Sequence, residues 1–507
     1  MKITKNNSLF ILPILTGILL VLAYPPYDLE FLVWISLIPL FYFLINKKIS
    51  PKKAFIGGTL AGIVFFGKSF SWVFATYPFE WLGATTQKEN LLFLILTIVL
   101  FTIQTVFLGL FLGVFSWLVK KIAHINKITF WSFLIIPSLW IIFEYLRAWG
   151  FGIIHLGKET LFGPHWTFGN LAYMLHNNLL LIQFADIGGI YGISFLISLV
   201  NVSIFFLVEE ILKPKFSKKS ILITIIALIS IGLTWNSYGV YKLKTEEKQL
   251  RAGPPRVKIA LLQTNFLSGS EFNPYQKKEV FKAVLDLFQT TKEKADIIIV
   301  PEGFSIVAQT GNKEIARYLL KDFWQPGQIY LENAKIIEDN GGIKSRLFYY
   351  DLEKEQPLAY YDKMLLVPNG DFLPYLTKLF LKIYSFNLNL EQKFYQKGEK
   401  NEPVQTPKGN IGGSICSGII SPNIIREITK KGAEFLVSVS SDAPFHGVNT
   451  LLAQNLAMSK LRAVENRRYF AQATNMGYSF LLSPKGEIIT KTSQFGNTIL
   501  FSNIYLL

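Results

Sequence analysis

The sequence is poor in cysteine and in charged residues. One cysteine, Cys416, occurs among 507 residues, which excludes an intramolecular disulfide and a metal site made of several cysteines. Charged residues make up 17% of the chain and hydrophobic residues 50%, whereas about 25% of an average soluble protein is charged. This composition indicates a membrane protein.

Histidines are also few, and no group of them has the spacing of metal ligands. The five histidines lie at positions 124, 155, 165, 176 and 446. We therefore expect no metal, and nothing in the sequence indicates another cofactor.

Long apolar runs fill the first half of the chain. Crossing a bilayer takes about 20 helical residues, and seven segments meet that length, at about 8–24, 29–46, 54–76, 91–119, 129–148, 188–211 and 220–241. The second half alternates short strands with helices, which is typical of an α/β domain. We predict a seven-helix membrane bundle at 1–245, a charged and Gly/Pro-rich linker at 246–256, and an α/β domain at 257–507.

Within the second half, the strand-like and helical runs are distinct enough to place. The expected strands lie at 257–265, 297–300, 347–351, 411–416, 435–440, 469–473 and 478–483. The expected helices lie at about 275–293, 422–431 and 450–467.

The net charge of +16 is explained by membrane topology rather than by a nucleic-acid partner. Thirteen lysines lie in the N-terminal segment and in the second, fourth and sixth loops between the expected spans, whereas the alternate loops hold very few. By the positive-inside rule, the N-terminus is cytoplasmic, and after seven crossings the α/β domain is outside the cytoplasm. In a bacterium with two membranes, that compartment is the periplasm.

Cys416 is a candidate nucleophile because it ends a β-type apolar run and has small neighbours. Small residues let the backbone turn sharply and leave room for a substrate carbonyl beside the sulfur. A buried core cysteine is the alternative interpretation. Two further stretches favour catalysis, because Glu302 and Lys363 each lie at one end of an apolar segment. A thiol with an ordinary pKa is only a few per cent thiolate at neutral pH, so it needs such a base or positive charge nearby.

The order Glu302, Lys363, Cys416 resembles the Glu-Lys-Cys triad of the nitrilase (carbon-nitrogen hydrolase) superfamily. In the membrane half, three motifs resemble the membrane segments of the apolipoprotein N-acyltransferase family. They are Leu22–Asp28, Trp140–Trp149 and Asp186–Phe195. That family joins a multi-span bundle to a nitrilase-like periplasmic domain, so the resemblance covers nearly the whole chain. It implies a four-layer α-β-β-α sandwich for the second half.

The resemblance also implies a reaction and a place in the cell. Glu302 would be the general base, Lys363 would stabilise the thiolate and the oxyanion, and Cys416 would carry the acyl group as a thioester. The acyl donor would be a glycerophospholipid, and the acceptor would be the N-terminal amine of a diacylglyceryl-cysteine on a lipoprotein. The enzyme would lie in the bacterial inner membrane, with its catalytic domain in the periplasm.

This chain departs from the family pattern around the site. The family usually has Cys-Tyr-Glu at the nucleophile, and here Ser417 and Gly418 follow Cys416, so a carboxylate is missing. Asp371 replaces a glutamate after the lysine, and Phe272 takes the place of a tryptophan. The family carries one more span after the domain, and the last residues of this sequence are too short an apolar run to be one.

Two other stretches are candidates for substrate contact. Asp442 ends the strand-like run that follows the nucleophile. After Pro374 the chain predicts a helix with lysines on one face, and its other face carries Leu376, Leu379, Phe380 and Ile383. Such a helix suits a bilayer surface, although packing on the domain core gives the same pattern. We predict a lipid-facing lid.

Two alternative functions stay open. A membrane-tethered nitrilase-type amidase would use water as the acyl acceptor. A catalytically weak paralogue would bind lipid or lipoprotein without turnover, and Gly418 is the feature that supports it.

Overall fold

The computed structural model describes residues 10–82, 84, 86–121, 130–251, 253, 255–266, 274–290, 294–310, 313–319, 326–351, 353–354, 356–383 and 394–507. The chain forms two compact units. Unit 1 comprises Met1–Ser71, Ile98–Ile154 and Trp166–Thr245. Unit 2 comprises Trp72–Thr97, His155–His165 and Glu246–Leu507. Two segments of the first half, 72–97 and 155–165, therefore pack with the second half.

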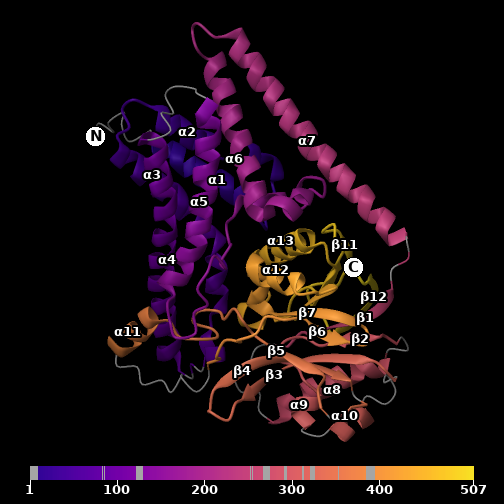
Figure 1. Cartoon of the computed structure of the whole chain (residues 1–507). Helices are drawn as coiled ribbons and strands as arrows, with labels where there is room; N and C mark the ends of the chain where they lie inside the picture. Colours follow the sequence, from indigo (N-terminus) through magenta and orange to yellow (C-terminus); the bar gives the residue numbers. More distant parts are fainter. Residues whose placement is uncertain are drawn as a thin grey trace. The chain divides into compact units, whose positions relative to one another are not determined.

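Unit 1 is built from helices that are apolar along most of their length (Figure 1). They are α1 (Ile11–Ala23), α2 (Ile38–Ile45), α3 (Pro51–Ser69), the larger part of α4 (Gln87–Lys121), α5 (Phe130–Ile154), α6 (Ala185–Ile211) and most of α7 (Lys218–Arg251). Helices α3 and α4 approach closely through glycines, since a Cβ placed on Gly62 would lie 2.6 Å from Cα of Gly109. Small residues at such crossings are typical of membrane helix pairs.

Five helices in the described part of the chain are long and apolar enough to cross a membrane. They are Pro51–Thr76, Gln87–Lys121, Trp131–Ile154, Leu181–Ile211 and Lys218–Lys248. The first two expected spans instead form shorter apolar helices, Ile11–Ala23 and Glu30–Ile45. The second of these is divided into a 3₁₀ turn, η2 (Glu30–Trp34), and α2. The predicted count of seven is therefore not confirmed.

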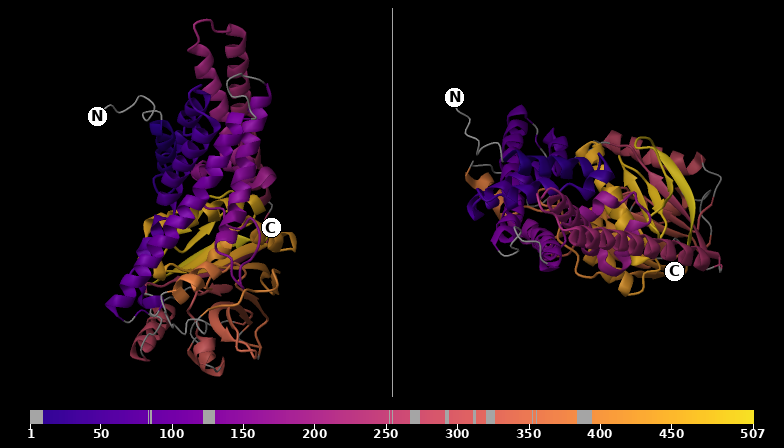
Figure 2. Two further views of the ribbon diagram at one scale, coloured as in Figure 1. Left: turned by 90° about the vertical axis from the view of Figure 1, so that its left-hand side faces the viewer. Right: turned by 90° about the horizontal axis from the view of Figure 1, so that it is seen from above.

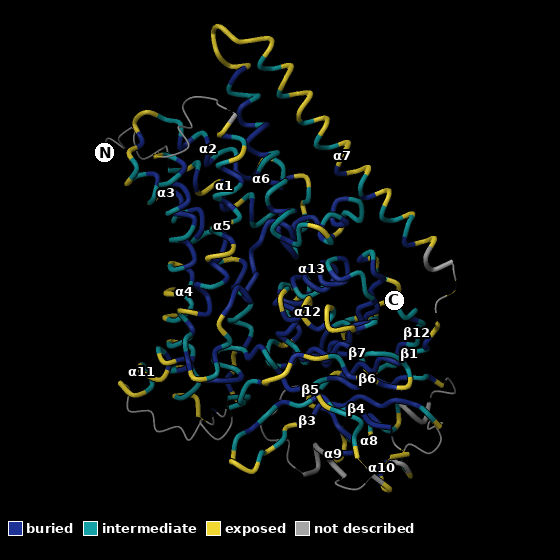
Figure 3. Tube along the Cα trace, viewed as in Figure 1, coloured by how far each residue is buried: buried dark blue, intermediate teal, exposed yellow. Residues whose placement is uncertain are grey.

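Helix α7 continues beyond the predicted start of the linker at 246 and ends at Arg251, and β1 begins at Arg256. The Lys, Glu, Gln and Leu residues of this stretch favour helix. Only the Gly/Pro-rich end, where Gly253 has φ +74°, separates the helix from the sheet. Figure 3 shows that α7 is exposed along much of its length.

Unit 2 contains two six-stranded sheets with helices outside each of them, and this confirms the predicted sandwich (Figures 1 and 2). The first sheet has the order β12-β1-β2-β3-β4-β5, with strands Thr498–Tyr505, Arg256–Gln263, Ile297–Ile299, Ile329–Ile337, Ile343–Asp351 and Ala359–Asp362. The second has the order β11-β10-β9-β8-β7-β6, with strands Ile488–Lys491, Phe480–Leu482, Phe470–Asn475, Phe435–Ser441, Gly409–Ile415 and Val404–Thr406.

Five helices cover the outer faces of the sheets. Helices α8 (Pro274–Thr290), α9 (Val307–Thr310) and α10 (Lys313–Leu319) lie outside the first sheet, and α12 (Pro422–Lys430) and α13 (Asn449–Asn466) lie outside the second. Between the sheets the packing is close, because a Cβ on Gly413 would overlap the hydroxyl of Tyr349. The facing strands are buried along most of their length (Figure 3).

Three of the predicted site residues follow the carboxyl ends of parallel strands in the two sheets. β1, β2 and β3 run parallel in the first sheet, as β7, β8 and β9 do in the second. The carboxyl ends of parallel strands meet at the same sheet edge, where ligands usually bind. Glu302 follows β2, Cys416 follows β7 and Asp442 follows β8.

Candidate active site

The nucleophile candidate lies at a sharp turn between a strand and a helix. β7 ends at Ile415, and Cys416 begins the 3₁₀ turn η8 (Cys416–Ile420) with φ +48°. A positive φ is uncommon for a residue other than glycine and occurs often at functional sites. The turn leaves no room for a side chain at Gly418, since a Cβ there would overlap Oγ of Ser414.

Glu302 lies in contact with both of its expected partners. Its Oε1 lies 3.1 Å from Nζ of Lys363. Burial raises the pKa of Glu302, and the nearby Asp371 adds to this, while Lys363 and the interaction with the Cys416 thiol lower it. A carboxylate with a raised pKa is a better proton acceptor, as a general base requires.

Lys363 is held between two carboxylates in the interior. It directly follows β5, and its side chain is 2% exposed. Nζ lies 2.9 Å from Oδ2 of Asp371 and 3.1 Å from Oε1 of Glu302. Burial alone would lower the pKa of Lys363, but the two carboxylates outweigh burial and raise that pKa well above its usual range. Lys363 is therefore a fixed cation beside the thiol.

The environment keeps Cys416 protonated at rest. Burial raises the pKa of the Cys416 thiol, and the charge of Glu302 raises it further, whereas Lys363 lowers it. A thiolate at Cys416 is therefore disfavoured in the absence of substrate. It can form only when a base takes the proton as substrate arrives.

Asp371 is fixed by the backbone on both sides. Its Oδ2 accepts a hydrogen bond from the N–H of Val367 at 2.8 Å, and its carbonyl accepts one from the N–H of Tyr395 at 2.8 Å. The shorter side chain of aspartate thus still reaches Lys363.

Asp442 is also buried beside this group. Its Oδ2 accepts a hydrogen bond from Oγ1 of Thr474 at 3.3 Å. Burial raises the pKa of Asp442 to about 7, and the charge of Glu302 contributes to that rise. Its own charge, in turn, contributes to the raised pKa of the Cys416 thiol.

Ser417 and Phe272 were also predicted to lie near the site. Ser417 donates a hydrogen bond to the carbonyl of Leu365, which ties the turn at Cys416 to the chain after Lys363. Phe272 lies outside the described residues.

The predicted lid forms a helix, α11 (Tyr375–Ile383). Its buried side differs from the expected apolar face, because Thr377 is buried and Leu381 packs against a cluster from segment 72–97, made of Phe79, Ala84 and Phe93. Leu379 and Ile383 are 54% and 62% exposed, and Leu376 and Phe380 are half-buried.

Three residues near the site were not predicted. Glu332 and Asn333 lie on β3, which was missing from the expected strands, and Tyr395 follows α11. The signal that could have found β3 is a charged and an amide residue that interrupt the otherwise apolar run beginning Ile329-Tyr-Leu. In the described part of the chain, no three His, Cys, Asp or Glu side chains are grouped as metal ligands would be.

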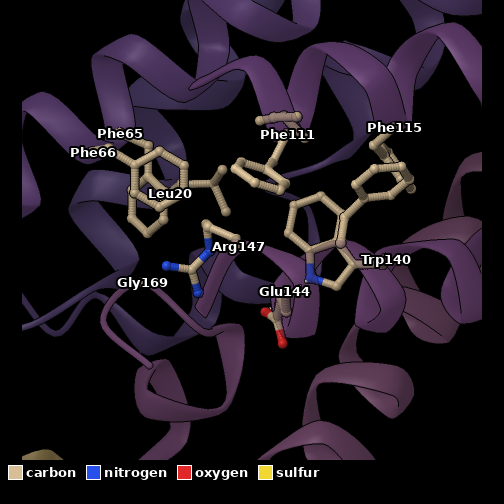
Figure 4. Close-up of a pocket in the computed structure, with 11 residues that line it drawn as sticks. Leu20, Phe65, Phe66, Phe111, Phe115, Trp140, Glu144, Arg147 and Gly169 are labelled. Carbon is tan, nitrogen blue, oxygen red and sulfur yellow. Dashed lines mark hydrogen bonds between the residues drawn. The ribbon is translucent and has the colours of Figure 1, made fainter. Parts of the chain in front are cut away.

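Unit 1 has a polar feature of its own, in a pocket lined mostly by aromatic side chains (Figure 4). Arg147 donates hydrogen bonds to the carbonyl of Phe168 and to Oδ1 of Asn170. Glu144 accepts one from the N–H of Leu171 at 2.8 Å. Glu144 and Arg147, the charged residues of the motif Trp140–Trp149, therefore hold the segment 168–171 in place.

Comparisons with known proteins cover both halves of the chain. The family description "Apolipoprotein N-acyltransferase N-terminal domain" matches residues 16–203, and "Carbon-nitrogen hydrolase" matches residues 258–506. The chain belongs to the apolipoprotein N-acyltransferase family. This confirms the resemblance drawn from the motifs, and with it the expectation of an acyltransferase.

Individual relatives in this family match over almost their full length. The apolipoprotein N-acyltransferase of Geobacter metallireducens is 26% identical over 98% of this chain and 89% of its own length. That of Pasteurella multocida is 26% identical over 98% of this chain and 90% of its own length. Among solved structures, the C. elegans NitFhit protein has a TM-score of 0.38 and 20% identity over 50% of this chain and 61% of that chain.

Proposed function

We propose that this protein transfers an acyl chain from a glycerophospholipid, through a thioester on Cys416, to the N-terminal amine of diacylglyceryl-cysteine on lipoproteins. The observation that carries the proposal is the buried group in which Nζ of Lys363 lies 3.1 Å from Glu302 and 2.9 Å from Asp371, with Cys416 interacting electrostatically with all three. Membership of the apolipoprotein N-acyltransferase family supports the same reaction.

In the first step, Glu302 takes the proton of the Cys416 thiol as sulfur attacks the ester carbonyl of the phospholipid. Lys363 stabilises the oxyanion of the tetrahedral intermediate, because a fixed cation in a buried site interacts strongly with a developing charge. The C–O bond then breaks, Glu302 returns the proton to the leaving oxygen, and lysophospholipid departs. Cys416 is left as a thioester.

In the second step, the amine of the lipoprotein attacks the thioester carbonyl and Glu302 accepts a proton from it. The C–S bond breaks, the sulfur regains a proton, and an amide is released. The site returns to its resting state, in which the thiol is protonated.

Acyl loading without acceptor tests the first step. Purified protein incubated with phospholipid that carries a labelled acyl chain should acquire label, and neutral hydroxylamine should remove it, because this reagent cleaves thioesters and spares amides. Cys416→Ala should take up no label. Since the chain has one cysteine, any thioester can be assigned to Cys416.

The acceptor decides between this function and its alternatives. A diacylglyceryl peptide with a free N-terminal amine should discharge the label onto itself, and an N-blocked peptide should not. Release of label to water alone would indicate the amidase-type hydrolase. Wild-type protein that never loads with any phospholipid class would refute acyl transfer and leave the lipid-binding paralogue.

The lid belongs to the same proposal. α11 exposes Leu379 and Ile383 beside Lys378 and Lys382, a combination that suits contact with acyl chains and lipid headgroups. In this role the helix lies at the membrane surface, where the donor phospholipid enters the site.

The proposed location is the bacterial inner membrane, with the N-terminus in the cytoplasm and unit 2 in the periplasm. The lysine-rich loops of unit 1 support this orientation. A reporter that is active only outside the cytoplasm should be active when fused after Leu507 and silent after Lys121. The reverse pattern would overturn the orientation and, with it, the lipoprotein acceptor.

A further inference from the structure

The general base lies in a loop, so its position depends on what holds that loop. β2 ends at Ile299, and the last ladder contact beyond it is the hydrogen bond from the N–H of Val300 to the carbonyl of Leu331, at 3.0 Å. Glu302 comes two residues later, and α9 begins only at Val307. The segment between them has no strand partner of its own.

Asn333, on the neighbouring strand β3, holds the loop directly behind the base. Its Oδ1 accepts a hydrogen bond from the N–H of Gly303 at 3.0 Å. Its Nδ2 donates to Oγ of Ser345 at 3.1 Å and to the carbonyl of Arg346 at 3.1 Å. Asn333 is 3% exposed, so the amide is fixed at both ends within the protein.

Glu332 holds the other end of the same loop. Its Oε2 accepts hydrogen bonds from the N–H groups of Ile306 at 2.6 Å and Val307 at 3.0 Å, and its Oε1 accepts one from Ala308 at 2.9 Å. The residue is fully buried. Neighbouring side chains on a strand point to opposite faces. Glu332 and Asn333 therefore hydrogen-bond the loop from opposite faces of the sheet.

The same network reaches the lysine of the site. The carbonyl of Ser345 accepts a hydrogen bond from the N–H of Lys363 at 2.9 Å, while its Oγ accepts from Asn333. A continuous series of hydrogen bonds therefore runs from the residue after Glu302, through Asn333 and Ser345, to the backbone of Lys363. This series sets the relative position of the base and the cation.

We propose that Asn333, assisted by Glu332, is a positioning residue that holds Glu302 against the Cys416 thiol. The inference rests on the proposed role of Glu302 as the base. It also accounts for two adjacent polar side chains in the buried middle of β3, since burying polar groups costs free energy unless they are hydrogen-bonded. A displacement of about 1 Å in a catalytic group can cost about 100-fold in rate.

Alkylation of the single cysteine by iodoacetamide measures activation of the thiol without any lipid. At pH 7, Asn333→Ala should slow alkylation of Cys416 about 10- to 100-fold, and Glu302→Gln should slow it at least as much. Because Asn333 acts through Glu302, the double variant should be no slower than Glu302→Gln alone. Such non-additivity is expected of residues that act as one unit.

Gln328→Ala is the matched control. Gln328 is 1% exposed, and its Nε2 donates to the carbonyl of Ala295 at 2.7 Å, at the opposite end of β3 from the site. Gln328→Ala should lower the melting temperature of the protein about as much as Asn333→Ala does. It should leave the alkylation rate of Cys416 unchanged.

If Asn333→Ala does not fold, Ser345→Ala serves instead. It removes one acceptor of the Asn333 amide, and it should slow alkylation several-fold, again only when Glu302 is present. Additive slowing in the double variant, or wild-type alkylation in folded Asn333→Ala protein, would overturn the inference. The alkylation rates of the single and double variants could match the expectation while the wild-type protein never acquires acyl label. That result would refute only the proposed function.

Discussion

Replacing Lys363 by methionine removes the only charge of opposite sign that contacts both Glu302 and Asp371 among the described contacts. The three side chains are 2%, 15% and 12% exposed, and Nζ lies 3.1 and 2.9 Å from the two carboxylates. Breaking a buried ion pair by removing one partner typically costs about 3–5 kcal/mol, because it leaves an uncompensated buried charge. We expect Lys363→Met to lower the stability of the protein by an amount of that order.

The rate of acyl loading should fall by more than the loss of oxyanion stabilisation alone. That loss accounts for about 10²- to 10³-fold. Without the cation, the charge of Asp371 is no longer opposed, so the pKa of Glu302 rises further and the base is protonated over a wider pH range. Loading, measured as hydroxylamine-sensitive label per molecule against time, should be undetectable near neutral pH.

A second substitution separates stability from catalysis. Lys363→Met combined with Asp371→Asn removes one of the two unpaired charges, so the melting temperature should recover in part while loading stays absent. Lys344→Met is the control, because Nζ of Lys344 lies 3.5 Å from Oδ2 of Asp362, and the described ion pairs link it to neither Glu302 nor Asp371. Loading by the single variant at near the normal rate would remove Lys363 from the mechanism. Recovery of loading in the double variant would mean that Lys363 only neutralises Asp371.

Three further changes test other parts of the site. Asp442→Asn removes a charge that interacts with Glu302, so the acidic limb of the pH–loading profile should move to lower pH. Because the pKa of Asp442 is raised to about 7 from a usual value near 4, the folded wild type binds more protons than the unfolded chain across this interval. Its stability therefore falls as pH rises from about 4 to 7, and Asp442→Asn should flatten that slope in thermal unfolding. Gly418→Ala should slow loading because its Cβ overlaps Oγ of Ser414, and Ser414→Ala in the same chain should restore the rate. Leu379→Asp should fold normally, since Leu379 is 54% exposed, and should slow loading from phospholipid in vesicles but not from a water-soluble short-chain ester.

Glu302 and Cys416 could be predicted from the sequence because each follows an apolar run, whereas Lys363 was identified by its place in the Glu-Lys-Cys order. Such runs are buried strands, and the carboxyl ends of parallel strands meet at one edge. The spacing along the chain, from 302 to 363 to 416, contains no information about distance. The strand ends indicate proximity for Glu302 and Cys416. The resemblance to the nitrilase triad adds Lys363, whose strand β5 is not among the expected strands.

β3 could not be predicted in the same way. Its residues Glu332 and Asn333 interrupt the apolar pattern that indicates a buried strand. They are buried because their hydrogen-bond partners are backbone groups of a loop about 25 to 30 residues earlier in the chain. A sequence does not display such partners, so polar residues of this kind resemble exposed ones until the fold is known.

The division of the chain into two units could not be predicted for the same reason: it depends on partners that are distant in the sequence. Segment 72–97 contains the ends of two apolar helices, and segment 155–165 follows a third. Both belong to unit 2 through contacts that depend on three-dimensional proximity. The ring of Trp72 lies 5.3 Å from that of Phe445, and Nδ1 of His165 lies 2.8 Å from Oγ of Ser421. Hydrophobic periodicity locates helices, but it does not identify such partners.

The charge arrangement explains why a second carboxylate accompanies the base. In the proposed first step, the proton of Cys416 passes to Glu302 as negative charge appears on the substrate oxygen, so the net charge of the site does not change. Neutral Glu302 no longer attracts Lys363, and the cation is available to the oxyanion. Asp371 lies 2.9 Å from Nζ and raises the pKa of Lys363, so it holds the cation in place while its other partner changes. A site with Glu302 alone would lose the anchor of its cation at the moment when the cation is needed.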